Sequence, residues 1–174
     1  MNNTTMIVTM KTGYRTGMIT SLLLAILMVV GCSDGPNTPD ISPEEDQQYL
    51  EENEQRPNVI VTDSGLQYEV IEEGDGEQPN ETSLIRFRGQ GWLADFTIFD
   101  STLQSGKEAR VQDFIPGLRE GLLLMREGAN YEFAVPGDLG FGDEGPFPDG
   151  VHPGATLGYR LELIEIVDES APEE

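Results

Sequence analysis

The sequence predicts an α+β domain in which an antiparallel sheet of five to six strands wraps around one short helix. Two observations lead to this fold class. Several segments alternate apolar and polar residues, which is typical of half-buried antiparallel strands. One further segment repeats its apolar residues at helical spacing. A one-layer sheet leaves an apolar face uncovered, and this helix is the regular element that would cover it.

Four segments carry the clearest strand pattern. In each of them every second residue is apolar, and the residues between are mostly polar or small. The predicted strands cover residues 66–70, 85–88, 131–135 and 157–163.

The predicted helix covers residues 117–127. Leu118, Leu122 and Met125 recur at helical spacing beside charged side chains, so one face of the helix is apolar. Gly128 follows as a stop signal, because glycine readily adopts the left-handed conformation that ends a helix.

The domain organisation follows from composition. We expect a flexible acidic tether at 32–58, because so few large apolar side chains cannot offset the entropy of ordering the chain. Within it, Ser42, Pro43 and Glu45 have the form of a helix start, so a short helix through Glu54 is an alternative. The globular domain is predicted at 59–168, followed by an acidic tail at 169–174.

Residues 1–31 predict a lipoprotein signal peptide. They contain two basic residues, no acidic residue, and an apolar run shorter than the roughly 20 residues of a bilayer helix. The segment 29–32 (VVGC) resembles the bacterial lipobox, after which the new N-terminal cysteine, Cys32, is lipid-modified. An uncleaved anchor or ordinary secretion is the alternative.

The net charge excludes some partners. The full chain carries a formal charge of −22, and without residues 1–31 it has 8 basic and 32 acidic residues, a charge of −24. Such a surface argues against binding to nucleic acid or to anionic lipid.

Four short motifs predict the functional site. Each places an aromatic or branched aliphatic side chain beside a turn residue, so together they predict a shallow dry pocket with one carboxylate, Asp100, at its edge. That pocket suits a prolyl ring, and X-Pro bonds isomerise over tens to hundreds of seconds unaided. The motifs are Phe99-Asp100-Ser101, Phe114-Ile115-Pro116-Gly117-Leu118, Phe141-Gly142 and Val151-His152-Pro153-Gly154-Ala155-Thr156-Leu157.

The order of these motifs resembles that of a known family. The segment 62–68 (TDSGLQY), followed by Gly74-Asp75-Gly76 and Pro79, is similar to the opening of bacterial FKBP-type peptidyl-prolyl cis-trans isomerase domains. The four motifs then follow in the family's order, so that the resemblance covers residues 64–168. It implies a strongly bent antiparallel sheet around a short helix. It also implies isomerisation of X-Pro bonds without cofactor, metal or covalent intermediate.

The resemblance implies a role for each site residue. The Ile115 N–H would hold the substrate carbonyl, and Asp100 would supply a field rather than a proton. Burial of the amide would weaken its double-bond character and favour the twisted transition state. The residues assigned to catalysis are Phe99, Asp100, Ile115 and Phe141, and those assigned to substrate binding are Phe87, Phe114, Leu118, Val151 and Tyr159.

The chain also departs from the family pattern. Phe87 and Phe141 stand where the family commonly has tyrosines, and each missing hydroxyl removes a hydrogen bond worth about 0.5 to 1.5 kcal/mol. Leu118 replaces the tryptophan of the pocket floor, and Trp92 is a candidate to refill the widened space. We therefore expect weaker catalysis and poor binding of macrolide inhibitors.

Two functions stay open at this point. One is a lipid-anchored prolyl isomerase that acts on proline-containing polypeptides and helps exported proteins fold at the cell envelope, at the outer membrane or periplasmic face rather than the inner membrane. The other is a non-catalytic binding or chaperone module. Asp100 has the alternative role of supporting a turn, and His152 that of an ordinary loop residue. A calcium site among the acids of residues 136–154 is conceivable, although a solvated loop fits their spacing better.

Overall fold

The computed structural model describes residues 41–143 and 147–167. The predicted signal peptide, Cys32 and the predicted acidic tail lie outside these residues. The described elements, in chain order, are α1 (Pro43–Glu54), β1 (Val59–Val61), β2 (Gln67–Glu72), β3 (Leu84–Leu93), β4 (Ile98–Ser101), β5 (Lys107–Arg110), the 3₁₀ turn η1 (Val111–Asp113), α2 (Pro116–Leu122), β6 (Asn130–Val135), the 3₁₀ turn η2 (Gly137–Leu139) and β7 (Leu157–Ile166).

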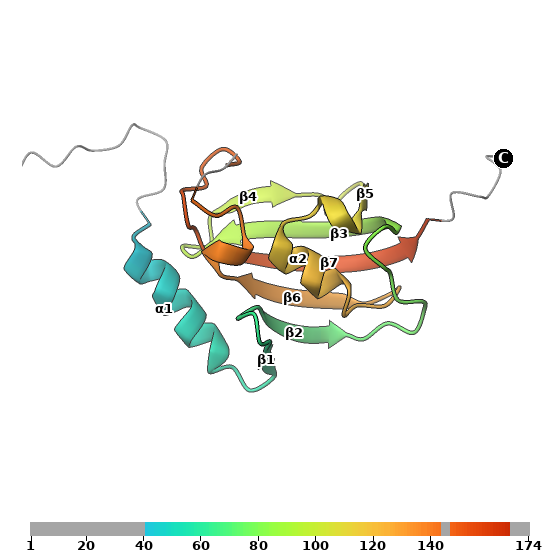
Figure 1. The fold of residues 1–174 in the computed structure, drawn as a ribbon, viewed down its shortest axis with the longest axis horizontal. Coiled ribbons are helices and arrows are strands. Elements are labelled where there is room, and N and C mark those ends of the chain that lie inside the picture. The colour runs from blue at the N-terminus through green and yellow to red at the C-terminus, as the bar shows by residue number, and fades with distance from the viewer. Residues whose placement is uncertain (1–40, 144–146, 168–174) are drawn as a thin grey trace, which may run out of the picture. The chain divides into compact units, whose positions relative to one another are not determined.

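All strand pairs are antiparallel and form one sheet in the order β1-β2-β6-β7-β3-β4, with β5 also paired to β3 (Figure 1). The predicted α+β class is confirmed, and the four predicted strands correspond to β2, β3, β6 and β7. The sheet has seven strands rather than five to six. The additional strands β1, β4 and β5 are only three or four residues long, too short to show an alternating pattern.

The helix α2 packs on the inner face of the sheet, as Figure 1 shows. Its glycines let the backbones approach closely: a Cβ on Gly121 would lie 2.4 Å from the ring of Phe133 on β6. The helix ends at Leu122, not at residue 127 as predicted. Leu118, Leu122 and Met125 are nevertheless all buried. The helical spacing of these residues therefore reflects shared burial across a helix and the turn after it.

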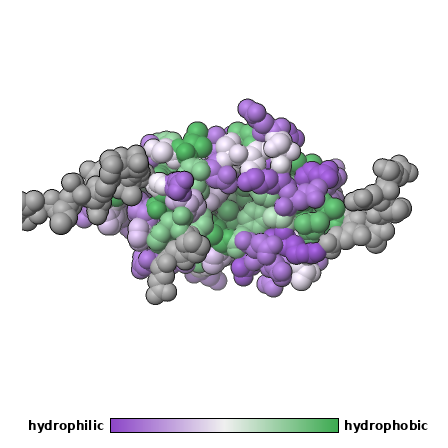
Figure 2. All heavy atoms as spheres, turned by 90° about the horizontal axis from the view of Figure 1, so that it is seen from above, coloured by the Kyte–Doolittle hydropathy of each residue, from purple (hydrophilic) through white to green (hydrophobic). Residues whose placement is uncertain are grey.

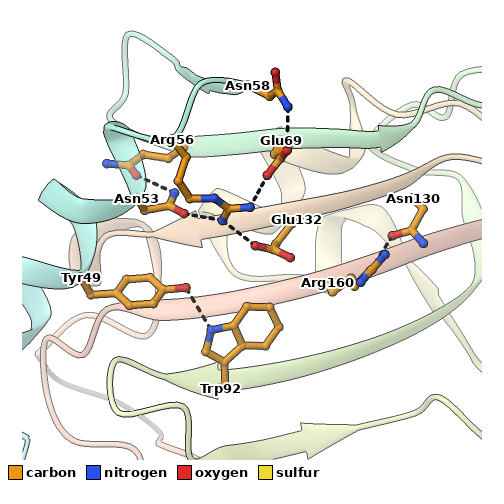
Figure 3. Close-up of polar contacts among 10 residues, drawn as sticks. Tyr49, Asn53, Arg56, Asn58, Glu69, Trp92, Asn130, Glu132 and Arg160 are labelled. Atoms are coloured by element: carbon orange, nitrogen blue, oxygen red, sulfur yellow. Dashed lines mark hydrogen bonds and ion pairs between the residues drawn. The ribbon is translucent and has the colours of Figure 1, made fainter.

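The helix α1 lies within the segment for which the sequence favoured a tether. It begins as the alternative stated, with a capping box in which Ser42 Oγ accepts a hydrogen bond from Glu45 N–H (3.3 Å) and Glu45 Oε2 accepts one from Ser42 N–H (2.7 Å). The helix contacts the sheet mainly through polar side chains, which an apolar pattern does not reveal (Figure 3). Neither α1 nor α2 is long and apolar enough to cross a membrane.

The burial of Leu122 predicts a large effect on stability. Leu122, the last residue of α2, is fully buried in the core, whereas Leu124, in the following turn, is 40% exposed. Leu122→Ala is expected to lower the free energy of unfolding by about 2 to 5 kcal/mol, because it leaves a cavity. The matched change Leu124→Ala is expected to cost only about 0.5 kcal/mol. Urea unfolding of both variants measures the difference, and equal losses would contradict this packing.

Candidate functional site

A pocket of about 180 Å³ opens between the inner face of β3, the strand β4, the start of α2 and the loop after β6. It is smaller than the roughly 300 to 1,000 Å³ of sites for drug-sized ligands, and so suits a single ring. Figure 2 shows a hydrophobic hollow bordered by hydrophilic side chains on one face of the molecule. Seven of the nine residues assigned from the sequence line the pocket: Phe87, Asp100, Phe114, Ile115, Leu118, Phe141 and Tyr159.

A β-bulge brings Asp100 to the pocket. Gly91 on β3 pairs with Asp100, but the next residue, Trp92, pairs with Ile98, so Phe99 is the extra residue of β4. Successive side chains of a regular strand face opposite sides, and a bulge re-aims them. As a result the carboxylate of Asp100 and the ring of Phe99 both lie on the inner face.

Phe99 and Val151 do not line the pocket. The ring of Phe99 packs edge-on against Tyr159, with centroids 5.6 Å apart and an interplanar angle of 88°, and so supports the pocket wall. Gly91 makes room for this pair, because a Cβ there would lie 2.8 Å from both rings. Val151 is buried in the core, and its N–H donates to the carbonyl of Pro148 (3.0 Å). Phe99, which is half-buried, therefore supports the wall formed by Tyr159, and Val151 belongs to the core.

The entry to α2 presents a free hydrogen-bond donor. Ile115 is the N-cap residue of α2 and precedes Pro116, which has no N–H. Within the described part of the chain no hydrogen bond uses the Ile115 N–H. Arg119 fixes this turn by donating to the carbonyls of Gln112 (2.9 Å) and Phe114 (3.2 Å). Phe114 in turn packs edge-on against Phe87, with ring centroids 5.0 Å apart.

The electrostatics of the pocket depend on Asp100. Its side chain is half exposed, and Lys107 Nζ on β5 lies 3.9 Å from Oδ1. Burial, and secondarily the charge of Asp100, raises the pKa of Tyr159, so its phenol stays neutral. No hydrogen bond joins that hydroxyl to any other described residue. The pocket therefore combines apolar walls with one carboxylate, one free N–H and one neutral hydroxyl.

Five further lining residues are absent from the set assigned from the sequence. Thr102 ties the end of β4 to β3: its Oγ1 accepts from the N–H of Gly89 (2.9 Å), and its own N–H donates to the Gly89 carbonyl (2.8 Å). The alternating pattern of residues 157–163 predicts that the side chain of Leu161 faces inward. No local sequence pattern predicts that the other four residues line the pocket. These lining residues are Gly89, Gln90, Thr102, Asp113 and Leu161.

Trp92 does not refill the pocket. Its Nε1–H donates to the hydroxyl of Tyr49 on α1 (3.0 Å), and its indole covers Gly158, on the face of the sheet away from the pocket (Figure 3). Residue parity along β3 explains the correction, since Trp92 alternates with the inward-facing Gly91 and Leu93.

His152 and the acidic residues considered for a calcium site lie between β6 and β7. The ring of His152 lies against the buried Asp46 of α1, with Nε2 and Oδ2 3.3 Å apart. Among the described residues, which do not include Glu144, no group of three His, Cys, Asp or Glu side chains could hold a metal ion.

Comparison with known proteins agrees with this geometry. Residues 75–164 match the family model described as FKBP-type peptidyl-prolyl cis-trans isomerase, and residues 41–70 match that of the domain amino-terminal to it. The FKBP-type 22 kDa peptidyl-prolyl cis-trans isomerase of Escherichia coli is 40% identical over 121 residues, which are 68% of this chain and 58% of that protein. The outer membrane protein MIP of Legionella longbeachae is 37% identical over 123 residues, 68% of this chain and 51% of that protein.

A solved structure gives the same result. The crystal structure of FkpA from Escherichia coli superposes with a TM-score of 0.67 and 29% identity, covering 71% of this chain and 58% of that one. The chain thus spans about half the length of the curated relatives it matches. Because a single family model covers residues 75–164, the chain belongs to the family of FKBP-type peptidyl-prolyl cis-trans isomerases.

Proposed function

We propose that this protein is a peptidyl-prolyl cis-trans isomerase that acts on proline-containing polypeptides. The observation that carries the proposal is the small apolar pocket with the unused N–H of Ile115 on its lining and Asp100 beside it. The relatives named as peptidyl-prolyl isomerases support it.

The pocket favours the twisted amide in two ways. Water stabilises the planar, charge-separated form of the amide, which has a barrier to rotation of about 18 to 20 kcal/mol. Aromatic walls such as Phe141 and Tyr159 exclude that water and so stabilise the twisted form relative to the planar one. The Ile115 N–H donates to the substrate carbonyl, and Asp100 supplies a negative field beside the rotating bond.

The missing hydroxyls at Phe87 and Phe141 make the activity weak. Phe87 leaves Asp100 without a hydrogen-bond donor, and Phe141 leaves a polar group of the substrate without one. Each loss costs about 0.5 to 1.5 kcal/mol. The free hydroxyl of Tyr159 offsets part of this loss, since it lines the same pocket and stays neutral. A module that binds proline segments without isomerising them is the alternative that these substitutions favour.

We further propose that the protein is a lipoprotein of the cell envelope. Its leader would be residues 1–31, its lipid would be attached at Cys32, and the part of the predicted tether between Cys32 and α1 would link the lipid to the isomerase domain. The name of the relative from Legionella longbeachae, an outer membrane protein, supports an envelope location.

Removal of the pocket wall is expected to abolish most of the activity. Phe99→Ala removes the ring that supports Tyr159 and is expected to lower kcat/KM about tenfold or more, which corresponds to about 1.4 kcal/mol of transition-state stabilisation. Asp100→Ala is expected to cost about two- to tenfold, because its charge is half exposed. Exchange NMR on a set of X-Pro peptides measures both rates.

Asp63→Ala is the control for charge. This substitution also replaces an aspartate by alanine, but in an exposed turn that does not line the pocket. The parent protein and this variant should isomerise the peptides equally well. A parent protein that binds the peptides without accelerating their isomerisation would refute the enzyme and favour the holding module.

The lipid anchor has a separate test. Cys32→Ser is expected to abolish metabolic labelling with palmitate and to release the protein from the membrane fraction, since two or more acyl chains make attachment stable. Ser33→Ala, at the next position, should leave both unchanged. Labelling that survives Cys32→Ser would contradict the proposed lipidation site.

A further inference from the structure

The helix α1 crosses a row of paired residues on the outer face of the sheet. This row consists of register partners on four neighbouring strands: Gln67 pairs with Ala134, Ala134 with Gly158, and Gly158 with Trp92. At one end of the row, Gln67 Nε2 donates to the carbonyl of Leu50 (3.1 Å), and Asn53 Nδ2 donates to Gln67 Oε1 (2.8 Å).

At the other end of the row, Tyr49 holds Trp92 against the sheet (Figure 3). Gly158 provides the space for both side chains, because a Cβ there would lie 2.0 Å from Trp92 Nε1 and 2.6 Å from Tyr49 Oη. Burial raises the pKa of Tyr49, so its hydroxyl stays neutral and accepts the indole hydrogen bond. The ring of Tyr49 also packs edge-on against Phe96 in the β3–β4 turn, with centroids 6.0 Å apart.

The adjacent row of the sheet belongs to the pocket. Here Tyr159 pairs with Gly91, and Gly91 pairs with Asp100. Tyr159 follows Gly158 in β7, and Gly91 precedes Trp92 in β3. The strands β7 and β3 therefore contact α1 on their outer face, and their next residues, Tyr159 and Gly91, face the pocket. Asp100 on β4 joins this inner row as the register partner of Gly91.

A second contact ties α1 to the segment that leads into β7. Asp46 Oδ1 accepts a hydrogen bond from the N–H of Thr156 (3.0 Å), two residues before Gly158. Asp46 is 7% exposed, so this bond is shielded from water. The helix α1 thus contacts β7, which carries Tyr159, and β3, whose Gly91 lies against the rings of Tyr159 and Phe99.

We propose that α1 is a clamp that positions the wall of the prolyl pocket from the opposite face of the sheet, with Tyr49 and Trp92 as positioning residues that act through Phe99 and Tyr159. The proposal rests on the proposed isomerase function and adds to it a requirement for the segment that precedes the catalytic domain. Undocking of α1 would let β3 and β4 shift and loosen the aromatic pair.

Gly158→Ala tests the clamp without changing a residue of the pocket. Its methyl group would displace Trp92 and Tyr49 on the outer face, and the backbone of Gly158 is not in the left-handed region, so alanine fits the strand. In the full chain, purified in detergent, we expect kcat/KM for X-Pro peptides to fall about three- to tenfold. Tyr49→Phe, which removes only the hydroxyl, is expected to cost about twofold. Glu51→Ala, on the exposed side of α1, should have no effect.

A double-mutant cycle separates positioning from simple loss of stability. If Gly158 acts through the Phe99 wall, Gly158→Ala will have little further effect in a Phe99→Ala background. Equal losses in both backgrounds, or unchanged activity of Gly158→Ala, would overturn the proposal. If Gly158→Ala does not fold, Tyr49→Phe in the same two backgrounds decides the question by the same criterion.

Trp92 gives a readout that does not need catalysis. It is the only tryptophan of the chain, so its indole N–H has a unique NMR signal. Coupling between sites is reciprocal, so a proline peptide in the pocket should shift this signal in the parent protein and much less in Phe99→Ala. If the peptide shifts the signal without being isomerised, the proposed function fails and the clamp stands. A peptide that binds without shifting the signal, or that does not bind, overturns the clamp.

Discussion

Close approach of side chains to the two central strands is the constraint on which this structure depends. The strands β3 and β7 carry glycines where a Cβ would collide with a neighbour: Gly89 with Leu161, Gly91 with Phe99 and Tyr159, and Gly158 with Trp92 and Tyr49. The first two glycines make room on the inner face, where the pocket lies. Gly158 makes room on the outer face, where α1 docks. Because side chains alternate along a strand, one pair of strands serves both faces.

The pocket is built from packing and contains few polar groups. Its walls are aromatic rings that hold one another edge-on, as in the pairs Phe87–Phe114 and Phe99–Tyr159. Such pairs contribute about 0.5 to 1.5 kcal/mol beyond the burial of their area, and they fix ring orientation. The polar groups stand where the chain changes direction: Asp100 at a bulge and the Ile115 N–H at a helix start. A site of this kind can exclude water and hold one carbonyl, which are the two effects on which the proposed acceleration of X-Pro rotation depends.

The segment before the FKBP-type domain makes more contacts with the sheet than its composition predicts. Its helix donates and accepts hydrogen bonds on the sheet, and Arg56, just after the helix, forms ion pairs with Glu69 and Glu132 (Figure 3). Asp46 is the one buried residue of α1, so the helix does not dock through an apolar face. What the composition missed is that polar side chains dock this helix. Their partners, such as Gln67 and Thr156, are distant in the chain.

The resemblance of the sequence to a known family indicated most of the residues that line the pocket. The sequence by itself determined the fold class, the four long strands and the capping box of α1. These are local properties: alternation follows from the pleat of a strand, and a cap involves residues three apart. Only the tertiary structure decided that Trp92 faces α1 and that Phe99 packs edge-on against Tyr159. It alone also placed Thr102 and Asp113 beside the pocket. Those facts depend on the register between strands and on a single-residue bulge, and a shift of one residue reverses the face on which each side chain lies.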